Sequence, residues 1–198
     1  MQDDPSGWAS WLEGKGRNVT SQFGEDGLVA AALSRIGITN QWCFEVGAHD
    51  GLYFSNTKWM RDDGWNAVLI ESVRDHYVKL EALRTDKVHC IHATVGQGDL
   101  DRILRMCGAP ESMDFGCIDI DGQDYWVWKT LVTRPRVMLV EYGYWNKTGL
   151  VPPEGSPEVE HQAGLETICE LGRAKGYVPL VSTYCNVLFV DKEVWESN

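Results

Sequence analysis

Short apolar runs alternate along the chain with segments in which apolar residues recur every three or four positions. The runs are typical of strands that are buried on both faces, and the longer period is typical of the helices that cover them. Ahead of the first run, a helix is predicted in which Val29, Leu33 and Ile36 share one face and which ends at Gly37. Seven runs are predicted to be strands, namely 42–46, 67–70, 88–92, 114–120, 137–140, 177–181 and 186–190.

The segments between these runs predict the connecting helices. Ser55 is the expected N-cap of the first of them, and Pro135 and Gly176 end the last two. The final two strands are joined by a turn too short for a crossover, so they must pair antiparallel. The expected helices carry, in chain order, Trp59 and Met60; residues 74–84; Tyr125, Trp128 and Val132; and Leu165, Ile168 and Cys169.

The pattern therefore predicts an α/β fold. We expect a Rossmann-like, doubly wound sheet of seven strands that is mostly parallel, with an antiparallel C-terminal strand and an extra N-terminal helix. The chain has 198 residues and no linker-like segment, so residues 1–198 are predicted to form a single domain. Its first 20 residues are expected to be a polar extension.

Composition narrows the class of partner. Acidic residues outnumber basic ones by 29 to 18, which gives a formal net charge of −11, and nucleic acid is therefore not expected as a partner. No stretch is long and apolar enough to cross a bilayer, and the start lacks the segments of a secretion signal. The cysteines include no C-x-x-C pair and are expected to be reduced, with Cys43, Cys90 and Cys117 buried. We expect a cytoplasmic protein without a membrane partner, and leave monomer and homodimer both open.

The predicted first strand ends in an acid and a glycine-rich turn that reads FEVGAHDG over 44–51. Bare backbone at such a turn brings the chain close to a nucleotide-like ligand, although the turn alone could simply pack a helix on a strand. The dinucleotide fingerprint G-x-G-x-x-G needs a glycine where this chain has His49, so a pyrophosphate fits poorly. Glu71, at the end of the next strand, is placed to accept hydrogen bonds from ribose hydroxyls. A cofactor with an amino-acid end and a ribose but no phosphate fits these features: S-adenosylmethionine.

Several segments together resemble the FkbM-like methyltransferase family. They are FEVGAHDG at 44–51, SNT at 55–57, IDIDG at 118–122, and KGY at 175–177 with NVLFV at 186–190. The likeness runs from about residue 21 to 191 and implies the class I methyltransferase fold, with methyl transfer to a hydroxyl, often of a sugar or natural product. Two positions depart from the family pattern: His49 replaces a small polar residue, and Gly143 stands where asparagine often follows the Glu-Tyr pair.

Ligands of open α/β sheets bind at the carboxyl ends of the strands, which places the cofactor site. Gly47 and Gly51 are expected to admit the methionine moiety, and Glu71 to bind the ribose. Thr94 is expected to flank the adenine, while Asp119 faces the amino group or the sulfonium side. The predicted cofactor-binding residues are Gln22, Glu45, Gly47, His49, Gly51, Ser55, Asn56, Thr57, Glu71, Thr94 and Asp119.

Methyl transfer requires positioning of the acceptor and, for a weakly acidic hydroxyl, a base. The catalytic candidates are His49, Asp121 and Glu141, although a histidine in such a turn is often purely structural. Asp119, Asp121 and Glu141 also form a carboxylate cluster that Mg²⁺ could occupy, which makes Mg²⁺ a second candidate cofactor. The competing interpretation is that Asp119 bonds the cofactor, Asp121 caps the next helix and Glu141 pairs with a basic residue.

The long loop after residue 141 supplies the acceptor candidates Tyr144, Trp145 and His161, because specificity is usually carried by loops. The predicted function is S-adenosylmethionine-dependent O-methylation of a small hydroxylated acceptor, with nitrogen acceptors left open. One alternative is an inactive domain that still binds the cofactor. Another is a nicotinamide-dependent oxidoreductase, which the glycine spacing and the lack of a Tyr-x-x-x-Lys pair disfavour.

Overall fold

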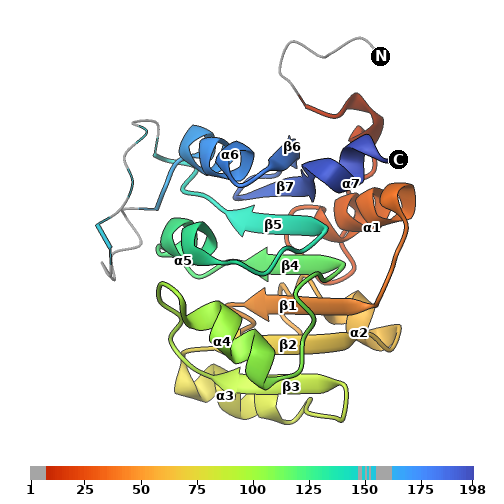
Figure 1. Ribbon diagram of the computed structural model, residues 1–198. Coiled ribbons are helices and arrows are strands. Elements are labelled where there is room, and N and C mark those ends of the chain that lie inside the picture. Colours follow the sequence, from red (N-terminus) through yellow and green to blue (C-terminus); the bar gives the residue numbers. More distant parts are fainter. Residues whose placement is uncertain (1–7, 147–148, 150, 152, 155–161) are drawn as a thin grey trace.

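Seven strands form one sheet in the order β3-β2-β1-β4-β5-β7-β6 within the residues that the computed structural model describes, 8–146, 149, 151, 153–154 and 162–198 (Figure 1). Strands β1 to β5 pair in parallel, and β7 runs antiparallel to both β5 and β6. The predicted seven-stranded doubly wound sheet with a reversed C-terminal strand is confirmed. The strands are β1 (Trp42–Val46), β2 (Asn66–Glu71), β3 (Val88–His92), β4 (Phe115–Ile118), β5 (Val137–Glu141), β6 (Tyr177–Ser182) and β7 (Asn186–Asp191).

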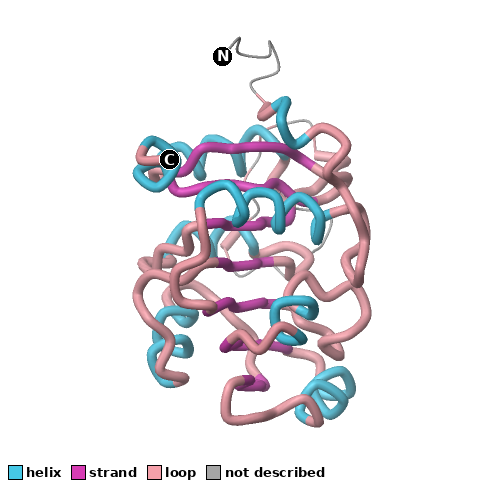
Figure 2. Tube along the Cα trace, turned by 90° about the vertical axis from the view of Figure 1, so that its right-hand side faces the viewer, coloured by secondary structure: helices cyan, strands magenta, loops and turns pink. Residues whose placement is uncertain are grey.

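Helices cover both faces of the sheet (Figure 2). One core lies beneath α4, α5 and α6, and the other beneath α1, α2, α3 and α7. Because side chains alternate along a strand, Phe44 and Val46 of β1 enter the first core and Cys43 enters the second. No helix in the described ranges is long and apolar enough to cross a membrane. The helices are α1 (Glu25–Ile36), α2 (Lys58–Asp62), α3 (Arg74–Glu81), α4 (Asp99–Met106), α5 (Asp124–Thr130), α6 (Leu165–Ala174) and α7 (Lys192–Glu196).

Two helices differ from the prediction. Helix α4 was not predicted, although Leu100, Ile103 and Leu104 give it a buried face. Helix α5 ends at Thr130, so the prediction that Val132 shares its face is wrong, and that side chain is 78% exposed. The cause lies in Asp101 of α4, whose carboxylate accepts hydrogen bonds from the backbone N–H groups of Val132 and of the next residue and holds this segment outside the helix.

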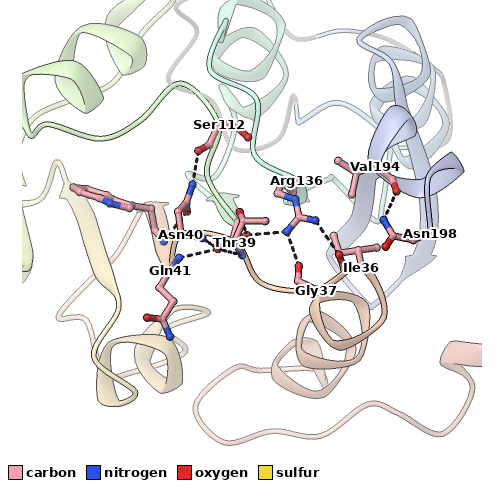
Figure 3. Close-up of polar contacts among 11 residues, drawn as sticks. Ile36, Gly37, Thr39, Asn40, Gln41, Ser112, Arg136, Val194 and Asn198 are labelled. Carbon is pink, nitrogen blue, oxygen red and sulfur yellow. Dashed lines mark hydrogen bonds and ion pairs between the residues drawn. The ribbon is translucent and has the colours of Figure 1, made fainter.

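A buried ion pair ties the end of α1 to the middle of the sheet. The carboxylate of Asp114 is fully buried and accepts backbone N–H bonds from Thr39, Asn40 and Gln41. Arg136 lies 3.0 Å from this carboxylate and donates to the carbonyls of Ile36 and Gly37 (Figure 3). Burial opposes the ionisation of Asp114, but the hydrogen bonds from Asn40, Thr39 and Gln41 lower its pKa overall. Asp114 and Arg136 therefore hold residues 36–41, which connect α1 to β1.

Residues 8–12, part of the predicted polar extension, pack against the sheet, whereas residues 13–19 are exposed. The N–H of Ala9 donates to the carbonyl of Leu180 on the edge strand β6. The guanidinium of Arg35 lies 4.8 Å from the ring centroid of Trp11 and 4.7 Å from that of Trp195. These cation–π contacts join the N-terminal segment, α1 and α7, and thereby position the loop that follows at residues 17–24.

Candidate functional site

Two cavities adjoin at the carboxyl ends of β1 and β4, where the sequence places the cofactor. They share Gly47 and Asp121 and enclose about 290 Å³ and about 180 Å³. Gly51, Thr57 and Glu71 line neither of them. The predicted residues that line the larger cavity are Gln22, Glu45, Gly47, His49, Ser55, Asn56, Asp119, Asp121 and Glu141.

The smaller cavity is largely apolar. Ile70, Val95 and Ile120 line it together with Thr94, the residue predicted to flank the adenine. Ser72 and Gln123 add polar groups at its wall, and neither was singled out in the sequence. An apolar slot with a few polar groups is suited to a flat heterocycle.

The glycines of the turn serve internal packing. Gly47 has φ +83°, and a Cβ built on it would lie 1.7 Å from the carbonyl oxygen of Asp119. Gly51 has φ +72°, and its Cβ would meet the side chains of Leu80 and Leu83. The expectation that Gly51 admits the methionine moiety is therefore wrong, because this glycine faces α3. Gly47 does line both cavities, but the atom nearest to its built Cβ is the carbonyl oxygen of Asp119, the residue that follows β4.

Glu45 organises the adjoining loop. Its buried carboxylate accepts hydrogen bonds from Ser55 Oγ at 2.8 Å, from the Asn56 backbone N–H at 2.7 Å and from Thr57 Oγ1 at 2.6 Å. Burial raises the pKa of Glu45, while the hydrogen bonds from Thr57, Asn56 and Ser55 oppose that rise. The predicted N-cap role of Ser55 is wrong, because α2 starts after Thr57 and the Ser55 hydroxyl is directed to Glu45. Glu45 thus holds the wall on which Ser55 and Asn56 face the cavity.

Glu71 supports the glycine turn from behind. Its Oε2 accepts the backbone N–H of His49 at 2.8 Å, and its Oε1 accepts that of Val73 at 2.6 Å. Each carboxylate oxygen can accept a second hydrogen bond. Glu71 therefore fixes the turn and keeps acceptor capacity for a ligand hydroxyl.

His49 has a left-handed backbone, with φ +50°, and its ring lies 3.7 Å from that of His76. Its Nδ1 is 3.4 Å from Asp50 Oδ1. Partial burial favours the protonated form of Asp50, but hydrogen bonds from the N–H groups of Tyr53 and Leu52, with the contact from His49, lower its pKa to about 2. His49 lies at the cavity wall, and its ring centroid is 5.9 Å from that of Tyr53.

Four carboxyl groups gather around the junction of the cavities. Burial, with the charges of Asp124 and Asp121 adding to it, raises the pKa of Asp119 to about 7. Burial likewise raises that of Asp124 to about 6, although the N–H groups of Gly122 and Ile120 bond its oxygens. Burial, followed by the charges of Asp119 and Asp124, raises the pKa of Glu141 to about 11. Burial therefore favours the protonated form of Glu141, whose side chain hydrogen-bonds Asp119.

The predicted Mg²⁺ site is not supported. In the described part of the chain, no group of three or more His, Cys, Asp or Glu side chains is arranged to hold a metal ion. The reason is that Glu141 Oε2 accepts the Asp121 backbone N–H at 2.9 Å and the Gln162 side-chain amide at 2.6 Å. Among the described residues Glu141 meets these groups and no basic side chain. Asp124 holds the turn before α5, whose N-cap is Gln123, so Asp121 does not cap this helix.

The raised pKa values predict how the ligand-free protein responds to pH. Between about pH 5 and pH 8 the native state binds more protons at Asp119, Asp124 and Glu141 than the unfolded chain does, so its stability falls as pH rises. We expect a lower melting temperature at the upper end of this range in calorimetry. Asp119→Asn should flatten the dependence, and a melting temperature that rises with pH in both proteins would contradict this account.

The N-terminal loop forms a further wall that the sequence indicated only through Gln22. Asp26 accepts the backbone N–H groups of Val19, Thr20 and Ser21, which fixes the loop. The hydroxyl of Thr20 donates to the Ser55 carbonyl at 2.9 Å. The loop is thus joined directly to the segment that Glu45 holds, and Gln22 lines the larger cavity between them.

The described acceptor candidates, Tyr144 and Trp145, lie at the surface and line neither cavity. Tyr144 and Trp145 are 41% and 43% exposed, and their ring centroids are 4.7 Å apart. His161 lies outside the described residues. Asn186, which was not predicted, donates to Asp119 at 3.5 Å from the start of β7, and its Oδ1 is buried without a hydrogen-bond partner.

The strand order, the reversed β7 and a crevice at the carboxyl ends of the parallel strands define the class I methyltransferase fold. Neither a family model nor a curated protein matches the chain. Several solved structures do superpose on this chain. A putative O-methyltransferase from Klebsiella pneumoniae aligns with TM-score 0.54 at 14% identity, over 89% of this chain and 83% of that one.

Two further structures have the same fold. The O-methyltransferase from Bacillus cereus, in complex with S-adenosylhomocysteine, aligns with TM-score 0.54 at 18% identity, over 92% of this chain and 86% of that one. A SAM-dependent methyltransferase from Aquifex aeolicus aligns with TM-score 0.51 at 12% identity, over 96% and 94%. At these identities the likeness establishes the fold.

Proposed function

We propose that this protein is an S-adenosylmethionine-dependent methyltransferase that methylates a hydroxyl of a small acceptor. One observation carries the proposal: two adjoining cavities, the smaller of which is the more apolar, share Gly47 and Asp121 at the carboxyl ends of β1 and β4. The apolar cavity suits the adenine, with Thr94 beside it. The larger one, which Asp119 and Asn56 line, suits the methionine end. The B. cereus structure, which has the same fold, contains S-adenosylhomocysteine, and the motifs that resemble the FkbM-like family support the same cofactor.

The carboxylates match the charge of this cofactor. S-adenosylmethionine carries a sulfonium and an ammonium, and both are favoured beside Asp119 and Asp121. A cation there also lowers the cost of ionising Asp119, whose pKa is raised in the ligand-free protein. We therefore infer that Asp119 faces the ammonium or sulfonium side.

The acceptor hydroxyl needs to lie in line with the methyl group and to lose its proton as the bond forms. Asp121 is exposed at the point that the two cavities share, so it can reach a proton on a molecule bound in the crevice. We assign it the role of base. His49 acts on the turn through its backbone, which donates to Glu71.

Isothermal titration of the protein with S-adenosylhomocysteine tests the cofactor without knowledge of the acceptor. Binding in the micromolar range supports the proposal, and formation of S-adenosylhomocysteine from S-adenosylmethionine with a hydroxylated acceptor completes it. Binding without any turnover of acceptors would favour the inactive cofactor-binding domain. A thermal shift with NAD and none with S-adenosylhomocysteine would contradict the proposal.

Glu71→Ala is expected to weaken S-adenosylhomocysteine binding by about 1–3 kcal/mol, because the turn that lines the larger cavity loses the carboxylate that accepts the His49 backbone N–H. The measurement is the same titration. Glu81→Ala is the matched control, because Glu81 is a surface residue of α3 that pairs with Arg84. Equal affinity in both variants and the unmodified protein would remove Glu71 from the site.

A further inference from the structure

Four aromatic side chains from three separate segments form a continuous exposed surface, here called the aromatic wall: Phe23, Tyr144, Trp145 and Tyr184. The ring centroids of Phe23 and Tyr184 are 5.0 Å apart, those of Tyr184 and Tyr144 are 4.4 Å apart, and those of Tyr144 and Trp145 are 4.7 Å apart. Their exposed fractions run from 40% to 52%. Exposed aromatic rings gathered in this way mark a binding surface more often than a packing defect.

None of the four rings lines the larger cavity itself, but each segment of the aromatic wall lies close in the chain to a residue that does. Gln22, next to Phe23, lines the cavity, as does Cys185, next to Tyr184. Glu141, three residues before Tyr144, lines it at the end of β5. The wall is therefore a candidate contact surface for a molecule that approaches the junction at Asp121 from this side.

The cavity beside the wall is lined by hydrogen-bond acceptors and negative charge. Asp119 and Asp121 line it, and none of the lining residues is Lys or Arg. The Oδ1 of Asn56, a residue only 5% exposed, is buried there without a hydrogen-bond partner. Beside Asp121, at the junction of the two cavities, such a lining favours groups that donate hydrogen bonds and disfavours an anionic group.

We propose that the aromatic wall binds the face of a ring-shaped acceptor that carries hydroxyl or amino donors and no anionic group, with Phe23 and Tyr184 as specificity-determining residues. The inference rests on the proposed function, since it concerns the acceptor side of the same crevice. A ring stacked on the wall directs its donors toward the carboxylates and one hydroxyl toward Asp121. A phosphate, sulfate or carboxylate on the ring is repelled by Asp121 when it lies beside that carboxylate.

A matched pair of probes tests both parts of this inference on the full-length protein loaded with S-adenosylhomocysteine. Phenyl β-D-glucopyranoside is neutral, and phenyl β-D-glucopyranosiduronate differs from it by one carboxylate. Ligand-observed NMR titration is expected to show binding of the glucoside and at least about tenfold weaker binding of the glucuronide. Tyr184→Ala is expected to weaken glucoside binding by about tenfold, and Tyr184→Phe, which keeps the ring, to restore it.

Affinity for S-adenosylhomocysteine, measured in the same samples, should be unchanged in both Tyr184 variants. Equal or tighter binding of the glucuronide overturns the charge assignment. Glucoside binding that is absent, or is unchanged by Tyr184→Ala, overturns the role of the wall. A failure of the proposed function is recognised separately, because the unmodified protein would then not bind S-adenosylhomocysteine at all.

Discussion

Gly47→Ala is expected to destabilise the fold by roughly 4 kcal/mol and to remove cofactor binding with it. Two costs add. The backbone at Gly47 is left-handed, with φ +83°, which strains any residue with a side chain. The new Cβ would also lie 1.7 Å from the carbonyl oxygen of Asp119, so β1 and β4 would have to separate where the two cavities meet. Urea unfolding followed by circular dichroism measures the loss.

Gly108→Ala separates the two costs. Gly108 has φ +75°, close to that of Gly47, but a Cβ there would meet nothing within 4 Å. We expect this control to lose only about 1 kcal/mol, from backbone strain. If both variants lost the same amount, contact with Asp119 would contribute nothing, and Gly47 would be a turn glycine like any other.

The turn at 44–51 shows how far sequence alone can lead. Its position at the end of a buried strand correctly indicated the crevice, because strand ends and helix starts are local features. The reason given for its glycines was only partly right. Gly51 faces Leu80 and Leu83, and that contact depends on how α3 packs, which one sequence does not reveal.

The fold was predicted more completely than the site. Apolar runs located every strand within a few residues, since burial on both faces of a sheet leaves a strong local pattern. The end of α5 was missed because it is set by Asp101, about thirty residues earlier in the chain. Helix α4 was not predicted, although the apolar spacing of its buried face is present in the sequence.

The carboxyl groups of Asp119, Asp121 and Glu141 show a further limit on what the sequence alone can predict. Their placement at the ends of β4 and β5 followed from the strand assignments, but their protonation did not. Glu141 pairs with Asn186 across β5 and β7, and the antiparallel register could have identified Asn186 as a neighbour of the site. Gln162, which donates to Glu141, lies just before α6 and had no sequence signal. Whether such a cluster binds a metal ion or shares protons is decided by these neighbours.

Phe23 and Tyr184 were overlooked for a similar reason. Each is a single aromatic residue in a loop, and loops carry no periodicity that would place one beside another. Only the packing of the N-terminal loop against the β6–β7 turn, where the Thr183 hydroxyl donates to Glu25 at 2.7 Å, brings the two rings together. A polar contact within the fold thus builds part of the surface that we assign to the acceptor.

Glu45→Ala is expected to destabilise the protein by about 4 kcal/mol, because three buried donors lose their acceptor at once. Ser55 Oγ, the Asn56 N–H and Thr57 Oγ1 all donate to this carboxylate, and each belongs to a residue that is at most 5% exposed. The segment that lines the larger cavity would come loose. Titration with S-adenosylhomocysteine, at a temperature where the variant is still folded, should therefore show weakened binding as well.

Glu45→Gln tests whether charge or shape matters at this position. One amide oxygen can still accept the Asn56 N–H, and the amide nitrogen can donate to the hydroxyls of Ser55 and Thr57, which are able to reverse their roles. Because burial already raises the pKa of Glu45, removal of its charge should be tolerated, and we expect a loss of only about 1 kcal/mol. Urea unfolding of the two variants side by side gives the answer. A glutamine variant as unstable as the alanine variant would show that the ionised carboxylate is required, and that Glu45 also acts as a charge beside the cofactor.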